Sequence, residues 1–384
     1  MSTLPPELLD HIFSLAEDAT ILRACSLVCY TWLLIARGYL FATLRTQEGQ
    51  LKPCRGITDL TRTLLGSSSL GHAVKSLVVD GLRSDAKLPV QDLVSVLRHL
   101  PRLQHLAVCN TRIPSFQIVA PFQERTSLHS LRLCNVGVYV DNPANILRLL
   151  DLFESIGELT LEKVWFKYSY GMSSRDTAAI LSVPSYLRIT SLILHGADDR
   201  AELLLDSFLL TQVRETLRAL HLSFYDFAPL VPCVSRFLSD PRCQLHNLAL
   251  DFSRCFPYTF WSHAPGLRAT QCAIEQVLQP PLPALRSLRR FALHTGNVPH
   301  EASAFWDMCL AVLGALPLSV VEVHVDVVNG AFGFDVPGFV RVLQRYGDLE
   351  GVFIHGLGDE KRLQGVAESV EKLLPNVNVQ YKYS

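Results

Sequence analysis

Leu103-Gln104-His105-Leu106-Ala107-Val108 is the stretch that decides the fold, because its spacing of apolar residues returns along most of the chain. Apolar residues occupy its first, fourth and sixth positions, and the alternation at its end is typical of a strand with one buried face. Eight of the nine intervals between successive fourth positions are 25 to 33 residues long, enough for one strand, one helix and two turns. The ten fourth positions are Leu77, Leu106, Leu131, Leu159, Leu192, Leu220, Leu248, Phe291, Val323 and Val352.

Apolar residues at helical spacing lie between these strands. Residues 93–97 and 305–313 form two such stretches, and a third runs from Ile146 to Phe153. Near the C-terminus, residues 363–374 predict a helix that Pro375 ends, and residues 377–381 alternate like a final strand. The chain therefore predicts strands alternating with helices, which is an α/β fold.

The repeated pattern resembles leucine-rich repeats over about residues 74–384. The resemblance implies an α/β solenoid with parallel strands on its concave side and helices on its convex side. One such repeat cannot hide its apolar face alone, so neighbouring repeats stack. Three residues after the last strand apolar, the family usually has Asn or Cys, and this chain has Leu82, Thr111, Val136 and Ser253. Because Asn110 and Asn135 come one residue early, we expect an irregular solenoid that lacks the family's hydrogen-bonded ladder.

One interval is longer than the others and marks an insertion over residues 253–287. Leu248 and Phe291 are 43 residues apart, and the aromatic run Phe256 to Trp261 lies between them. The run could pack over the rim of the sheet, or it could grip a target, because exposed aromatic residues anchor interfaces. The insertion could also break the strand register at this point.

The first 41 residues predict three short helices that cannot bury a core of their own. Pro5 and Pro6 suit a first helical turn, Asp18 can cap a second helix, and a third helix should end near Gly38. Their apolar stripes are too wide to be hidden among three helices, so some of these residues should remain for a partner.

The runs Leu4-Pro5-Pro6-Glu7-Leu8-Leu9, Ser26-Leu27-Val28-Cys29-x-x-Trp32 and Leu40-Phe41 resemble an F-box. Phe41 stands where the family usually has Trp, and residues 19–22 replace its usual Asp-Leu pair. The resemblance implies docking on the Skp-type adaptor of cullin-RING (SCF-type) ubiquitin ligases, with the repeats receiving a target protein. We expect the docking surface to include Leu4, Pro5, Ile12, Leu22, Leu27, Val28, Cys29, Trp32, Leu40 and Phe41.

These patterns divide the chain into three parts. Residues 1–45 form the docking module, residues 46–73 a linker or first cap layer with one short helix near Ile57 to Leu65, and residues 74–384 the solenoid. The alternative is that the N-terminal helices only cap a repeat scaffold that acts outside a ligase. Burial discriminates the two, because a cap would bury Leu4, Pro5, Leu40 and Phe41 on the first repeats.

The variable positions between the strand apolars should face away from the core, since side chains alternate along a strand. The residues just after the last strand apolar read Asp251, His294, Asp326 and His355 on four successive strands. Such neighbours lie about 5 Å apart in a sheet, and a histidine between carboxylates should hold its proton more tightly. The candidate target-binding residues on this face are Arg132, Glu158, Glu162, His195, His221, Asp251, His294, His324, Asp326 and His355.

Three interpretations of the Asp/His row stay open. It could be a set of cross-strand pairs worth about 0.2–1 kcal/mol each. It could be a polar grip for a partner peptide. It could also bind a metal ion with hydrolytic potential, because histidine and carboxylate are zinc ligands. The metal interpretation requires that the insertion leave the strand register intact, and no second set of metal ligands is evident. We therefore predict no metal, no cofactor and no catalytic residue.

The composition excludes several other classes of protein. With 35 Lys and Arg against 36 Asp and Glu, the net charge of −1 provides no basic field for nucleic acid. No apolar stretch is long enough for a bilayer, and no basic-then-apolar signal begins the chain. None of the ten cysteines forms a Cys-x-x-Cys pair, which favours buried thiols in a cytoplasmic or nuclear protein. Nucleophile-elbow, phosphate-loop and dinucleotide motifs are absent, so the sequence predicts an adaptor and not an enzyme.

Overall fold

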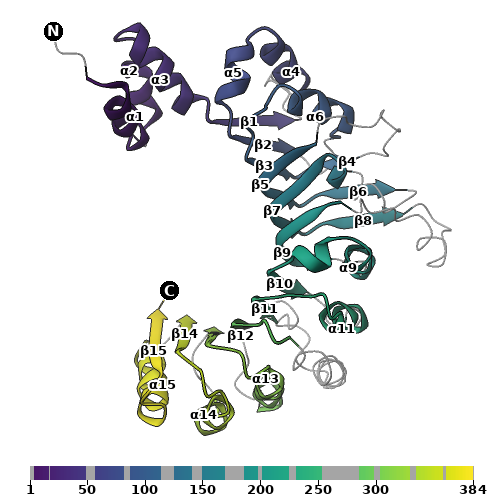
Figure 1. Cartoon of the computed structure of the whole chain (residues 1–384), viewed down its shortest axis with the longest axis vertical. Coiled ribbons are helices and arrows are strands. Elements are labelled where there is room, and N and C mark those ends of the chain that lie inside the picture. The colour runs from purple at the N-terminus through teal and green to yellow at the C-terminus, as the bar shows by residue number, and fades with distance from the viewer. Residues whose placement is uncertain are drawn as a thin grey trace. The chain divides into compact units, whose positions relative to one another are not determined.

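The computed structural model falls into two compact units, which are described separately (Figure 1). Unit 1 comprises Met1–Ile156 and Val164–Ile180, and unit 2 comprises Gly157–Lys163 and Leu181–Ser384. The structure describes residues 4–16, 18–48, 57–81, 87–113, 125–140, 149–168, 186–197, 201–224, 231–252, 285–297, 303–328, 334–357 and 360–383.

Unit 1 begins with three helices, α1 (Pro6–Ser14), α2 (Ala19–Cys25) and α3 (Tyr30–Leu40). As predicted, proline opens α1, and the Asp18 carboxylate caps α2 by accepting a hydrogen bond from the Thr20 amide at 2.7 Å. The third helix ends near Gly38 as predicted, at Leu40. A glycine inside a helix costs about 1 kcal/mol, and the packing of Tyr39 and Leu40 against the core of this module offsets that cost.

A twelve-stranded sheet follows, and every strand pair whose register is defined is parallel. The predicted α/β arrangement of leucine-rich-repeat type is therefore confirmed. The strands, in their order across the sheet, are β1 (Thr43–Glu48), β2 (Ser76–Gly81), β3 (His105–Cys109), β5 (Thr126–Cys134), β7 (Phe153–Glu162), β9 (Arg188–Ala197), β10 (Ala219–Phe224), β11 (Asn247–Asp251), β12 (Arg290–Asn297), β13 (Glu322–Val328), β14 (Gly351–Leu357) and β15 (Asn378–Tyr383).

The repeated apolar positions align from strand to strand, which fixes the register. In unit 2, Leu220 pairs with Leu248, Leu248 with Phe291 and Phe291 with Val323, and all four side chains are buried. The register therefore continues from β11 to β12, although the sequence left open a break at the insertion. Of the insertion itself, residues 253–284 lie outside the described residues, so the role of its aromatic run stays a prediction.

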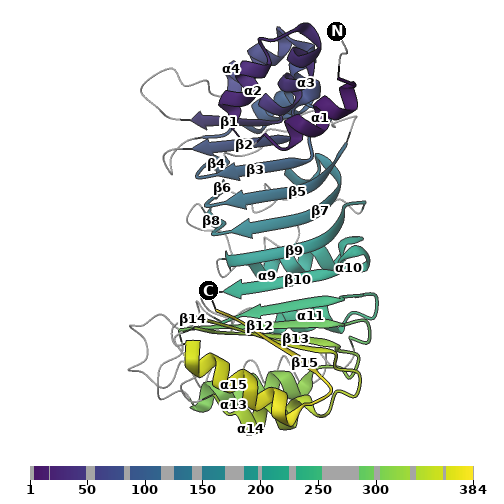
Figure 2. The same cartoon turned by 90° about the vertical axis from the view of Figure 1, so that its left-hand side faces the viewer.

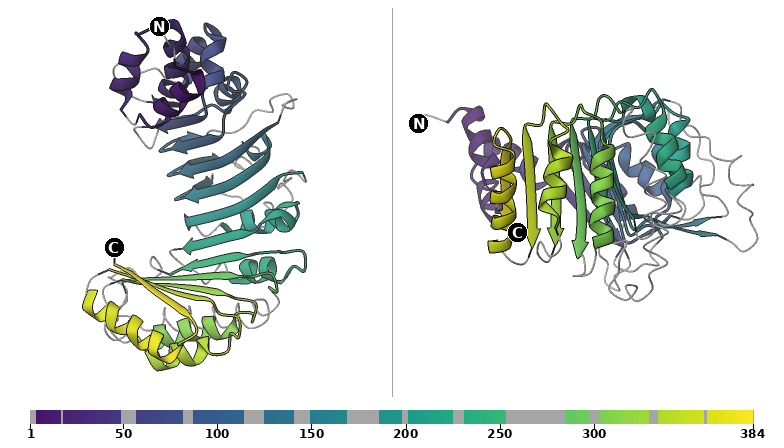
Figure 3. Two further views of the ribbon diagram at one scale, coloured as in Figure 1. Left: turned by 60° about the vertical axis from the view of Figure 1, so that its left-hand side comes forward. Right: turned by 90° about the horizontal axis from the view of Figure 1, so that it is seen from below.

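Helices of unit 2 lie along one side of its strands, as the left-hand view of Figure 3 shows. The predicted helix from Ile146 to Phe153 is only partly right, because Phe153 begins strand β7 and residues 141–148 lie outside the described residues. The helices after the N-terminal three are α4 (Ile57–Leu65), α5 (Ser68–Ala73), α6 (Val90–Leu97), α9 (Ala201–Leu209), α10 (Val213–Thr216), α11 (Val231–Ser239), α13 (Ser303–Ala315), α14 (Val336–Leu343) and α15 (Glu360–Leu373).

Three features of unit 1 were not predicted. Helix α5 follows α4 in the segment where one short helix was expected. Strand β1 pairs with β2 and so begins the sheet well before residue 74. A second, three-stranded sheet contains β4 (Arg112–Ile113), β6 (Gly137–Val140) and β8 (Trp165–Tyr168), seen beyond the ends of the main strands in Figure 2. Across the described part of the chain, no helix combines the length and the apolar character that crossing a bilayer requires.

The expectation that unit 1 lacks an asparagine ladder is wrong. The Asn110 amide donates to an Asp80 carboxylate oxygen at 2.9 Å, and the Asn135 amide donates to the Asn110 side-chain oxygen at 2.7 Å. Asn110 and Asn135 have φ angles of 51° and 54°, in the left-handed region that asparagine tolerates better than most residues. The ladder is thus built one residue earlier than in the pattern that the sequence was compared with.

Candidate functional site

Helix α1 has one buried and one exposed apolar stripe. Leu9 and Phe13 are both only 2% exposed, whereas Leu8, Ile12 and Leu15 are 51%, 50% and 69% exposed. Spacings of three and four residues place the exposed three on one face of the helix. Large apolar side chains left in water along one stripe favour a surface that another protein covers.

The expectation that the three helices cannot bury a core of their own is wrong, because they enclose a small one. Phe13, Leu22 and Ala36 form this buried core, and the ring of Trp32 meets Phe13 edge to face at 5.4 Å. The Tyr39 hydroxyl donates to the Asp10 carboxylate at 2.8 Å, which ties α3 to α1. Burial and this bond raise the pKa of Tyr39, so the hydroxyl stays protonated and keeps donating.

The predicted docking residues divide by burial. Leu4, Pro5, Ile12, Leu27, Val28 and Cys29 are exposed, with Leu27 at 85%, and Trp32, Leu40 and Phe41 are partly buried. Leu22 is only 6% exposed and belongs to the core of the module. Further exposed apolar side chains, which the docking prediction omitted, are Leu8, Leu15, Ile21, Tyr30 and Leu34. Helical spacing alone could not tell which of two adjacent stripes on α1 would face inward.

A second candidate surface is the polar face of the sheet in unit 2. The register pairs Asp251 with His294, His294 with Asp326 and Asp326 with His355, as the row in the sequence predicted. On the other side of Asp251 the row continues through Ser223 to His195. The row thus spans six strands of unit 2.

The tightest contact in this row joins His294 to Asp326, with Nδ1 and Oδ2 2.6 Å apart. Burial alone would lower the pKa of His294, but the hydrogen bond and charge of Asp326, with the charge of Asp251, raise it above its ordinary value. The same hydrogen bond lowers the pKa of Asp326. The prediction that histidine between carboxylates binds its proton more tightly therefore holds for His294.

His221 lies two residues before the row on β10 and differs from His294. Its ring meets His195 at 4.6 Å and stacks on His294 at 5.3 Å. Burial, followed by the charges of these two histidines, lowers the pKa of His221 to about 4. The imidazole of His221 is therefore neutral at pH 7. Its Nε2 atom and the Ser223 hydroxyl oxygen are both buried and accept or donate no hydrogen bond within the described structure.

The remaining predicted target-binding residues lie on three strands, β5, β7 and β13. The His324 ring stacks on Phe353 at 4.3 Å, and its Nε2 lies 3.6 Å from Glu322. Glu322 also pairs with Arg290 at 2.7 Å, across the same face. Arg132 on β5 and Glu158 on β7 are exposed, and Glu162 is partly buried. The predicted polar residues come together mainly on β9 to β14, while Arg132 belongs to unit 1.

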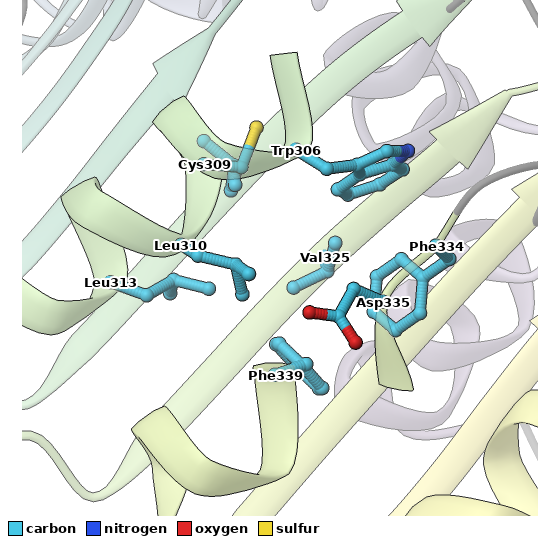
Figure 4. Close-up of a pocket in the computed structure, with 9 residues that line it drawn as sticks. Trp306, Cys309, Leu310, Leu313, Val325, Phe334, Asp335 and Phe339 are labelled. Atoms are coloured by element: carbon cyan, nitrogen blue, oxygen red, sulfur yellow. The ribbon is translucent and has the colours of Figure 1, made fainter. Parts of the chain in front are cut away.

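An apolar pocket on the helical side of unit 2 has a structural explanation (Figure 4). Its walls come from α13, α14 and the strands beneath, and include Trp306, Leu313 and Phe339. The Asp335 carboxylate at its edge caps α14 by accepting a hydrogen bond from the Gly338 amide at 3.0 Å. The pocket is thus the packing between successive helices of the repeat and is not a candidate site.

The comparison with protein families matches the N-terminal module. Residues 1–47 match the F-box-like family, and an F-box-like domain implies a Skp-type partner within an SCF-type ligase. No curated protein matches the chain. The chain therefore carries an F-box-like domain at its N-terminus, followed by a long parallel sheet consistent with a leucine-rich-repeat-like domain.

Proposed function

We propose that this protein is the substrate-recruiting adaptor of an SCF-type ubiquitin ligase, in which residues 4–41 dock on the Skp-type subunit and the sheet binds a target protein. The observation that carries the proposal is the exposed apolar surface of the F-box-like module, above all Leu27, Ile12 and Leu15. Leu22 and Phe13 support that surface from inside. The proposal includes a cytoplasmic or nuclear location.

The adaptor acts by position and needs no catalytic group of its own. Holding a target and a ligase scaffold on one chain makes the encounter with the charged ubiquitin conjugate effectively intramolecular. The polar residues of β9 to β14 are the proposed target surface, because they combine charged, aromatic and imidazole groups on adjacent strands. The chemistry of ubiquitin transfer belongs to other subunits.

Burial favours docking over a cap on a free-standing scaffold. A cap would bury Leu4 and Pro5, and both are exposed. Leu40 and Phe41, at the end of the module, are partly buried and fit either alternative. The exposed residues therefore support the adaptor proposal.

The test is binding of the full chain to a purified Skp-type subunit. Ile12→Asp combined with Leu27→Asp places charge on two exposed apolar positions and should weaken binding by at least about 100-fold. The matched control is Leu210→Asp, because Leu210 is 73% exposed in unit 2 and should not affect binding.

Far-UV circular dichroism of both variants checks that the fold is kept. Unchanged affinity in the double variant, or no binding by the unaltered chain, would favour a scaffold that works outside a ligase.

A further inference from the structure

We propose that His195, His221 and Asp251 form a binding site for a divalent transition metal ion, such as zinc, on the polar face of unit 2. The inference goes beyond the ligase role and does not depend on it. One ligand atom from each of the three residues lies within 4.8 Å of the other two. Among the described residues, this is the group of histidine, cysteine and carboxylate side chains that meets this condition.

The three residues come from adjacent strands, so the sheet itself sets their spacing. His195 is on β9, His221 on β10 and Asp251 on β11, and the register pairs Ser223 with both His195 and Asp251. Side chains two apart on a strand share a face, which places His221 beside the gap between His195 and Asp251. A site held by three backbone hydrogen-bonded strands is largely formed before the ion arrives.

Two buried atoms beside this gap lack partners. The Ser223 side chain is fully buried, and its hydroxyl oxygen has no hydrogen bond within the described structure. The Nε2 atom of His221 is also buried and also has no hydrogen bond within the described structure. A buried polar group without a partner is destabilising, so these two atoms, from residues two apart on β10, indicate a missing partner at this place.

The chemistry of the three side chains suits zinc. Zinc is bound by histidine nitrogen and carboxylate oxygen at about 2.0–2.2 Å, and sites with three protein ligands keep a fourth position open. The three ligand atoms already lie within 4.8 Å of one another, so small side-chain rotations would bring them to zinc–ligand distances. The open position would take water or a donor atom from another molecule.

The ligand set shares only Asp251 with the four-residue Asp/His row that the sequence singled out, and it departs from the sequence prediction of no metal. Nδ1 of His294 is committed to Asp326 at 2.6 Å, so these two residues already satisfy each other. His294 instead packs its ring flat against His221, at an interplanar angle of 11°. In this arrangement His294 holds the His221 ring in place and is a positioning residue, not a ligand.

The test is zinc binding by the full chain after treatment with EDTA, measured by competition with a chromophoric chelator. We expect one tightly bound zinc ion per chain. His221→Ala and Asp251→Asn should each weaken zinc binding by at least about 10-fold. The matched control is His105→Ala with His129→Ala, because these two rings also meet edge to face, at 5.8 Å, but belong to unit 1.

X-ray absorption at the zinc edge separates this site from binding by thiols. A first shell of nitrogen and oxygen that is lost in Asp251→Asn supports the proposal. Sulfur in that shell, unchanged affinity in both variants, or no retention of zinc by the unaltered chain would overturn it. Thermal unfolding in EDTA checks each variant, and Asp251→Asn, which is nearly isosteric, decides the matter if His221→Ala does not fold.

Discussion

The strand ends of unit 1 and unit 2 carry different chemistry at neighbouring positions of the repeat, since Asn110 and Asn135 each come one residue after the cysteine that continues the register of Asp80. In unit 1, Asp80, Asn110 and Asn135 satisfy one another in a ladder of side-chain hydrogen bonds. In unit 2, His195, Ser223 and Asp251 follow one another on three strands, and the Ser223 hydroxyl is left buried without a partner. Asp80 in the first set also accepts a hydrogen bond from Arg45, so each of its members has a side-chain partner.

This difference separates stability from recognition. A ladder whose members bond to each other holds adjacent turns in place and has little left to offer a ligand. The buried Ser223 hydroxyl without a partner within the described structure destabilises the isolated protein, and a ligand that bonds to it would remove that cost. We therefore expect substitutions in the ladder to lower stability and substitutions in the row to change binding.

Asn110→Ala should have the largest effect on stability. It removes the bonds to Asp80 and Asn135, each worth about 1 kcal/mol, and puts alanine in the left-handed region, which costs about 1 kcal/mol more. The expected loss in the free energy of unfolding is about 3 kcal/mol. Urea denaturation followed by circular dichroism measures it.

Asn110→Gly is the control that separates the two causes. Glycine tolerates the φ angle of 51° but has no amide group, so only the hydrogen-bond part of the loss should remain. Equal stability of the unaltered chain and Asn110→Ala would mean that the ladder does not hold unit 1 together.

Asp80 should make the stability of unit 1 depend on pH. Burial would raise its pKa, but bonds from Asn110 and Arg45 outweigh this and lower it. Because the unfolded chain then binds the proton more tightly, the contribution is complete above about pH 4 and is lost as pH falls through the folded pKa. Urea midpoints at a series of pH values should therefore fall less steeply in acid for Asp80→Asn than for the unaltered chain. If the urea midpoints of Asp80→Asn and of the unaltered chain fell equally steeply with pH, Asp80 would not be the source of the pH dependence.

Asp326→Asn in unit 2 should have the smallest effect on stability. Its pair with His294 is about one third exposed on both sides, and such pairs are worth about 0–1 kcal/mol. The same urea experiment should give a loss of less than about 1 kcal/mol. A loss as large as that of Asn110→Ala would remove the distinction between the two strand-end sets.

The apolar pattern predicted the sheet well because the buried positions repeat on every strand. It located Leu248 opposite Phe291 across a 43-residue interval. Strand β1 was missed because Thr46 stands where the pattern requires an apolar residue, although Thr46 is buried. The asparagine ladder was missed because the family pattern places its asparagine one residue after Asn110. In the structure, the left-handed backbone at Asn110 sets the position of the ladder.

The candidate sites were predicted less completely, because they depend on burial and on diagonal contacts. The row Asp251, His294 and Asp326 could be derived from spacing alone. The place of His221 between two neighbouring strands could not, since it lies two residues before that row. On α1, periodicity indicated two apolar stripes, and only the packed helices distinguish the core residue Phe13 from the exposed Ile12.

Hydrogen exchange of the full chain with and without a Skp-type subunit tests the central claim most directly. The account predicts a stable complex in which exchange slows in α1, α2 and α3, between Pro6 and Leu40, and is unchanged in β9 to β14. Slowed exchange confined to the sheet of unit 2, or no complex at all, would contradict the claim that the N-terminal helices are the docking module.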